Sequence, residues 1–106
     1  MKQLLDSHGF TESDLAEMLA VFRSHPSLEK VILFGSRALK TFKPASDVDL
    51  VLIYPEDDYR LVSRIKSQLE EDTKIPYFFD VLDFKTIESA ELKEHIALHG
   101  VEIYKK

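Results

Sequence analysis

The sequence has no cysteine, and glycine and proline are scarce, with three and four residues. Without cysteine the chain forms no disulfide and no thiolate metal site. No apolar run approaches the roughly 20 residues that a membrane-spanning helix needs, and the N-terminal segment becomes charged too early for a secretory signal. We therefore expect a cytoplasmic protein with no membrane partner.

Basic charge is in the minority, because 14 Lys and Arg stand against 19 Asp and Glu, for a formal net charge of −5. A protein that grips long nucleic acid irrespective of its sequence presents a basic face, so we expect no such partner. The rest is ordinary for a folded protein, with 44% hydrophobic and 31% charged residues. A length of 106 residues predicts a single domain over 1–106.

Hydrophobic periodicity and turn residues predict an order of helix, strand, short element, strand, helix, strand, helix, strand. The first helix begins at a capping box formed by Thr11 and Asp14, and negative charge at Asp57 and Asp58 favours the start of the second. The further expected elements are strands Lys30–Phe34, Asp47–Tyr54 and Tyr77–Phe84, a helix Glu91–His99 ended by Gly100, and an edge strand Val101–Tyr104.

Two of these strands are apolar on both faces, which places helices on both sides of a small sheet. The fold class is therefore α/β or α+β, between which composition alone does not choose.

A pair of carboxylates opens the second strand. Asp47 and Asp49 are two residues apart and therefore point to the same face. Two carboxylates at such a short distance raise each other's pKa unless a cation lies between them. An all-oxygen ligand set suits Mg²⁺. The alternative is a pair of solvated residues at the start of a strand.

The turn after the first strand has the composition of a phosphate site. Gly35 and Ser36 offer backbone N–H groups and a hydroxyl for a close approach, and a short helix over Ser36–Leu39 would present its N-terminus to an anion. Basic residues follow at Arg37, Lys40 and Lys43. Beside two carboxylates, such a turn suggests a triphosphate with Mg²⁺.

Asp80, in the middle of the third strand, is the candidate for a third carboxylate, because a charge there is costly unless it is paired or metal-bound. The alternative is a hydrogen-bonded edge residue. Asp83 points to the opposite face, where a solvated or capping role fits. His95 and His99 have the spacing of a zinc-binding helix, but without a third ligand we interpret them as partly exposed helix residues.

These residues resemble a known family. Gly35-Ser36-Arg37-Ala38, then Ser46-Asp47-Val48-Asp49-Leu50, then Asp80, is similar to the minimal nucleotidyltransferases (MNT) of the polymerase-β-type superfamily. The resemblance implies a small mixed sheet flanked by helices, the nucleotidyltransferase fold, and the transfer of AMP from ATP to a hydroxyl.

The resemblance also implies the roles of individual residues. Asp47 and Asp49 would bind two Mg²⁺ ions, and Asp80 would complete the site that holds the attacking hydroxyl. Gly35 and Ser36 would contact the β- and γ-phosphates, while Arg37 would either contact a phosphate or maintain the geometry of the loop. The sequence departs from the family at Leu39 and Lys40, where many relatives have arginine and glycine.

Relatives of this kind are commonly paired with HEPN-domain toxins. The resemblance therefore implies an antitoxin that attaches AMP to a tyrosine of its HEPN partner. Two alternatives stay open: adenylylation of a small hydroxylated molecule, and an antitoxin that acts by binding alone.

Overall fold

A four-stranded mixed sheet is the framework of the computed structural model within the part of the chain that it describes, residues 8–55, 58 and 60–106. The strand order is β3-β2-β1-β4, and β1 pairs antiparallel with both β2 and β4, whereas β2 and β3 are parallel. The small mixed sheet predicted from the sequence is thereby confirmed. The strands are β1 Lys30–Phe34, β2 Val48–Ile53, β3 Phe79–Asp83 and β4 Val101–Lys105.

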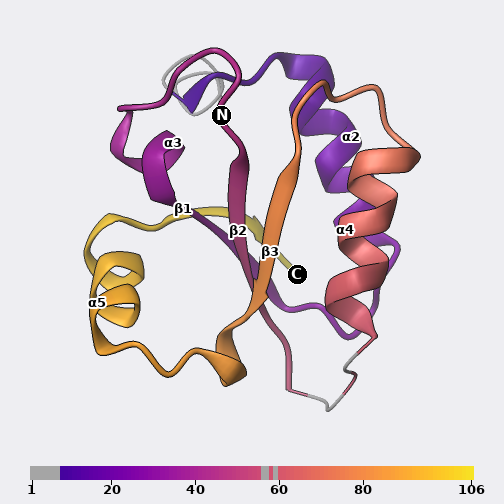
Figure 1. The fold of residues 1–106 in the computed structure, drawn as a ribbon. Helices are drawn as coiled ribbons and strands as arrows, with labels where there is room; N and C mark the ends of the chain where they lie inside the picture. Colours follow the sequence, from indigo (N-terminus) through magenta and orange to yellow (C-terminus); the bar gives the residue numbers. More distant parts are fainter. Residues whose placement is uncertain (1–7, 56–57, 59) are drawn as a thin grey trace.

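Helices cover both faces of this sheet, as expected (Figure 1). α2 (Glu12–Arg23) and α4 (Leu61–Glu71) lie on one face, and α5 (Ala90–His99) lies on the other. The short helix α3 (Gly35–Leu39) directly follows β1, and a 3₁₀ turn, η1 (Phe84–Thr86), follows β3. No helix of the described residues is long and apolar enough to span a bilayer.

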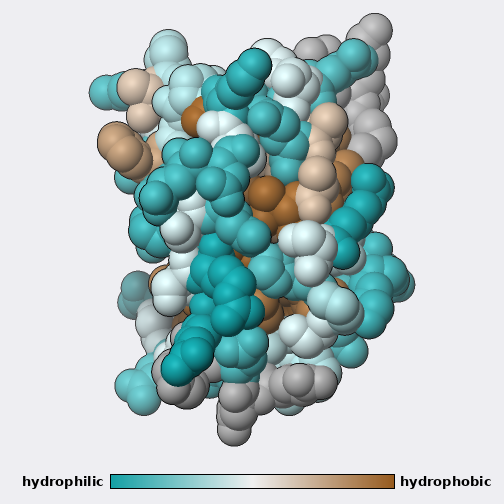
Figure 2. Space-filling view, turned by 90° about the vertical axis from the view of Figure 1, so that its right-hand side faces the viewer, coloured by the Kyte–Doolittle hydropathy of each residue, from teal (hydrophilic) through white to brown (hydrophobic). Residues whose placement is uncertain are grey.

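Two hydrophobic cores lie on the two sides of the sheet, because its strands alternate side chains between the faces. The larger core is buried under α2 and α4, whose outer surface is mainly hydrophilic (Figure 2). The smaller core lies under α5. Its buried members are Phe34, Val51, Ile87 and Ile96.

Element boundaries follow the predictions closely, with two informative differences. The third strand is shorter than expected. Before it, the Tyr77 ring packs on the guanidinium of Arg37. At its end, Asp83 caps η1 by accepting a hydrogen bond from the Lys85 N–H. The second long helix begins only at Leu61. Asp58 accepts the N–H of Arg60 just before it, while Asp57 lies outside the described residues.

The turn from α5 into β4 requires glycine for space. Gly100 ends α5 as expected, but its φ of −62° is not the left-handed conformation usual at helix ends. A β-carbon there would lie 2.6 Å from Ile32 Cγ2 and would collide with the Ile96 carbonyl. The close approach brings α5 down onto β1, next to the turn that follows it.

Candidate functional site

Strand register brings the three aspartates to one end of the sheet. Asp49 on β2 is the direct neighbour of Asp80 on β3, and Asp47 precedes β2 by one residue. All three belong to the face that carries α5, because they alternate with residues of the larger core. Asp80 is exposed on an edge strand, so burial does not make its charge costly, contrary to the sequence-based argument.

Asp49 is the electrostatic centre of this group. Its pKa is raised to about 6, first by burial and then by the neighbouring charges of Asp80 and Asp47, while Arg37 lowers it. The expected mutual repulsion of the carboxylates is therefore present. The cation of Arg37 therefore does not offset burial and the other two carboxylates at Asp49.

The donor set fits a hard divalent cation, because all three side chains offer carboxylate oxygens and repel one another in its absence. Across residues 8–55, 58 and 60–106, no three His, Cys, Asp or Glu side chains are gathered as a ready-made metal cage. The residues that could hold a metal are thus Asp47, Asp49 and Asp80, after adjustment of their side chains.

Gly35 makes the sharp turn that brings α3 beside Asp49. Its φ of +75° is a conformation that other residues rarely adopt, and a β-carbon would collide with the Asp49 carboxylate. Its N–H donates to Nε2 of His95 on α5, at 2.9 Å. One of the backbone donors predicted for phosphate is therefore already engaged, whereas the half-buried Ser36 follows it at the head of α3.

A second left-handed residue closes α3. Lys40, the C-cap, has a φ of 63°, and the N–H groups of Lys40 and Thr41 turn back to the carbonyls of Arg37 and Ser36, at 3.2 and 2.9 Å. This conformation favours glycine, and lysine adopts it at a cost of about 1 kcal/mol.

Arg37, one of the three basic residues noted for this loop, is wholly buried beneath it. Its Nη2 and Nε donate to the Ser46 carbonyl at 2.8 and 3.3 Å, and Nη1 donates to the carbonyls of His8 and Gly9 at 3.0 and 3.3 Å. Its own carbonyl contacts His8 Nδ1 at 2.6 Å.

Aromatic rings enclose the same guanidinium. Its carbon lies 4.1 Å from the centroid of Tyr77, 5.0 Å from Phe42 and 5.2 Å from Phe10, within the range of cation–π attraction. Of the two roles left open for Arg37, these contacts fit the one in which it maintains the geometry of the loop. Lys40 and Lys43 remain exposed nearby in the sequence.

Sequence reasoning missed two residues beside the carboxylates. His95 was treated as a bland helix residue, yet it binds the turn at Gly35. Phe78 belongs to an aromatic run, Tyr77 to Phe79, which the sequence suggests for core and interface, and it is 73% exposed. The Val48 N–H donates to the Phe78 carbonyl at 2.9 Å, which sets Phe78 level with Asp47 and on the face of Asp80. The available signal was the position of this aromatic residue, two before Asp80 and therefore on the same face of an extended segment.

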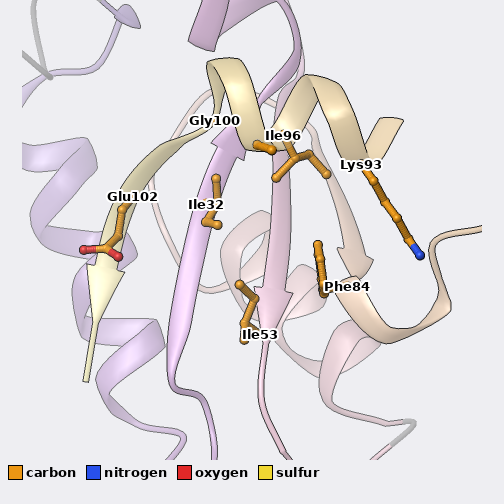
Figure 3. Close-up of a pocket in the computed structure, with 8 residues that line it drawn as sticks. Ile32, Ile53, Phe84, Lys93, Ile96, Gly100 and Glu102 are labelled. Carbon is orange, nitrogen blue, oxygen red and sulfur yellow. The ribbon is translucent and has the colours of Figure 1, made fainter. Parts of the chain in front are cut away.

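An apolar hollow of about 340 Å³ lies elsewhere on the same face of the sheet. Figure 3 shows Ile32, Ile53 and Ile96 around it, contributed by β1, β2 and α5. Its charged lining residues are Lys93 and Glu102, and none of the three aspartates lines it. The hollow is therefore separate from the group of three carboxylates.

Comparison with known proteins identifies a family model. Residues 17–106 match the model described as polymerase beta, nucleotidyltransferase. No curated protein matches the chain significantly.

Solved structures share the fold. A toxin–antitoxin crystal structure with AMP-PNP aligns with a TM-score of 0.71 at 19% identity, over 87% of this chain and 73% of that chain. A structure of a tri-AMPylated Shewanella oneidensis HEPN toxin in complex with MNT antitoxin aligns with a TM-score of 0.65 at 17% identity. The alignment covers 88% of this chain and 71% of that chain. A nucleotidyltransferase described as putative, from Sulfolobus solfataricus, aligns with a TM-score of 0.55 at 23% identity. The alignment covers 100% of this chain and 90% of that chain.

Replacing Lys40 by glycine should stabilise the protein. Relief of the left-handed strain outweighs the extra flexibility of glycine, so Lys40→Gly should raise the free energy of unfolding by roughly 0.5–1 kcal/mol in urea titrations. Lys43→Gly is the matched control, because Lys43 has no positive φ, and it should lower stability slightly. Equal effects of the two changes would contradict this account.

Asp49 should make stability fall as the pH rises from about 4 to 6. Its folded pKa of about 6 exceeds the ordinary 3.8, so the folded state binds the proton more tightly and loses that advantage on ionisation. In metal-free buffer, Asp49→Asn should match the wild type near pH 4 and exceed it at pH 8 by about 1–2 kcal/mol, after allowance for solvent screening. A pH-independent difference in urea unfolding would contradict this.

Proposed function

Because the chain belongs to the polymerase β nucleotidyltransferase family, we propose that it is a Mg²⁺-dependent enzyme that transfers AMP from ATP to a hydroxyl acceptor. The match agrees with the MNT resemblance read from the sequence. The observation that carries the proposal is the meeting of Asp47, Asp49 and Asp80 beside the Gly35 turn, with the pKa of Asp49 raised to about 6.

The proposed reaction is an in-line displacement at the α-phosphorus of ATP. The acceptor oxygen forms a bond to this phosphorus while the bond to the bridging oxygen of the β-phosphate breaks, and pyrophosphate leaves. Asp80 would receive the acceptor proton, and Asp47 and Asp49 would hold the metal. Two Mg²⁺ ions bound there would stabilise the charge on the entering and leaving oxygens.

The turn at Gly35 would hold the β- and γ-phosphates. The Ser36 hydroxyl and the backbone at the head of α3 supply hydrogen-bond donors, and the buried charge of Arg37 favours anions from below. Binding therefore depends on positioning and charge neutralisation, which are the main requirements of phosphoryl-type transfer.

We further propose that the acceptor is a tyrosine of a HEPN toxin partner and that the pair acts in the cytoplasm. Two observations support this choice. Solved structures with the same fold include an MNT antitoxin with its AMPylated HEPN toxin. In addition, the exposed Phe78, two residues before Asp80, offers a stacking partner for a phenol, which favours tyrosine over an aliphatic alcohol of a small molecule.

The first test is transfer of label. The protein is incubated with α-labelled ATP, MgCl₂ and the product of the neighbouring gene, and AMP attachment to a tyrosine is read by gel and mass spectrometry. Asp47→Asn with Asp49→Asn should lower the rate by roughly a thousandfold, since metal stabilisation is worth several kcal/mol and each 1.4 kcal/mol is tenfold. Glu71→Gln with Asp72→Asn, at the end of α4 on the other face of the sheet, is the charge-matched control and should retain full activity.

The same variants decide whether catalysis or binding neutralises the toxin. Under this proposal the double aspartate variant binds its partner and fails to protect cells from it. Full protection by that variant would support an antitoxin that acts by binding alone, and label transfer to a small hydroxylated molecule would support the other alternative.

Phe78 provides a separate test of the tyrosine acceptor. Phe78→Ala should raise the KM for the protein acceptor by roughly three- to tenfold, because an aromatic pair contributes about 0.5–1.5 kcal/mol, and should leave the KM for ATP unchanged. Phe78→Tyr preserves the ring and should behave as wild type. Equal acceptor KM values for wild type and Phe78→Ala would rule out the stacking contact.

A further inference from the structure

α5 places one polar side chain on the turn that makes the candidate site. His95 is half-buried and accepts the Gly35 N–H at Nε2, at 2.9 Å. Its ring also meets the edge of Phe34, with centroids 6.3 Å apart, and Phe34 is the residue that pairs with Asp49 across β1 and β2. His95 thus contacts two consecutive residues that both adjoin Asp49.

The hydrogen bond defines the state of this ring. A backbone N–H can only donate, so Nε2 of His95 must carry a lone pair and the neutral ring must carry its proton on Nδ1. A leucine of similar size would keep the apolar contact with Phe34 but would leave the Gly35 N–H without its acceptor. A glutamine could still present an oxygen near the position of Nε2.

The contact is relayed to a carboxylate through Gly35. On its other side, the α-carbon of Gly35 packs so closely against Asp49 that no β-carbon fits between them. Gly35 is therefore held between His95 of α5 and Asp49 of β2. Freedom for Gly35 to move would also free the Asp49 carboxylate and the head of α3, both of which the proposed reaction needs in fixed positions.

We propose that His95 is a positioning residue, which fixes Gly35 against Asp49 and so sets the carboxylate for the metal–nucleotide complex. This inference rests on the proposed function for its kinetic consequences. His99 is the natural comparison, because its ring lies 5.6 Å from that of His95 one turn along the same helix, but it is exposed.

The first experiment uses the wild-type chain without ligands. Ring ¹⁵N correlation spectra of His95 at alkaline pH should show the Nδ1–H tautomer, and the Gly35 amide should exchange slowly with solvent. In His95→Leu the Gly35 amide should lose this protection, whereas in His99→Leu it should keep it. An Nε2–H tautomer for His95, or fast exchange of Gly35 in the wild type, would overturn the proposal.

The second experiment separates positioning from folding. In His95→Leu, the affinity for Mn²⁺ with AMP-PNP and the apparent affinity for Mg²⁺–ATP should each fall roughly ten- to a hundredfold, as is typical when a residue supporting a metal ligand is lost. His95→Gln should restore most of both, and His99→Leu should change neither. A purely structural role would lower the folded fraction and the maximal rate while leaving the affinities unchanged.

The two proposals fail in different ways. If the wild type transfers no AMP, the proposed function fails, while the tautomer, the amide exchange and the Mn²⁺ titration still test His95. If the wild type is active and His95→Leu binds Mn²⁺ and nucleotide as well as the wild type does, the positioning role is wrong and the proposed function stands. Should His95→Leu fail to fold, His95→Gln and the wild-type spectra decide the question.

Discussion

The buried guanidinium of Arg37 is the interaction on which the arrangement of this end of the molecule depends. A charge removed from water costs several kcal/mol unless hydrogen bonds and opposite dipoles replace its hydration. Here the carbonyls of His8, Gly9 and Ser46 accept hydrogen bonds from the guanidinium, and three aromatic rings pack around it. These partners come from distant parts of the sequence. Satisfying one side chain therefore requires the segment before α2, the loop before β2 and the approach to β3 to meet beneath α3, and their meeting fixes where β2 begins.

The charge of Arg37 also acts on the pKa of Asp49, but it does not offset the effects that raise this pKa. Arg37 lowers the pKa of Asp49, yet burial together with Asp80 and Asp47 still raises it to about 6. The folded protein is therefore less stable with Asp49 ionised than with it protonated, which is the opposite of the usual effect of a paired aspartate. Electrostatic repulsion of this kind is typical of functional sites, where a bound cation would relieve it. The proposed Mg²⁺ is a cation of suitable charge, and the parallel register of β2 and β3 supplies the geometry by setting Asp80 beside Asp49.

The local pattern was sufficient to predict the strands, the capping box at Thr11 and the common face of Asp47 and Asp49, because these depend on residues a few positions apart. The pairing of Asp49 with Asp80 depends on the strand order, which periodicity does not give. The family resemblance implied only that Asp80 completes the same site. The sequence left two roles open for Arg37, because an arginine in a polar loop is normally solvated and no local pattern predicts that three rings from other segments will surround it. The His95–Gly35 bond joins residues 60 positions apart, so it follows from how α5 docks and not from any local motif.

The two ends of α3 differ in how strongly each position requires glycine. Gly35 and Lys40 both have left-handed φ values, and on backbone conformation alone each position favours glycine. At Lys40 only the conformation is at stake, since the side chain is exposed, and the anchoring of the loop by Arg37 can sustain a cost of about 1 kcal/mol. At Gly35 the conformation coincides with the packing of Asp49 on one side and the bond to His95 on the other. A side chain there would displace the carboxylate itself, so the first position is constrained by the site and the second only by the turn.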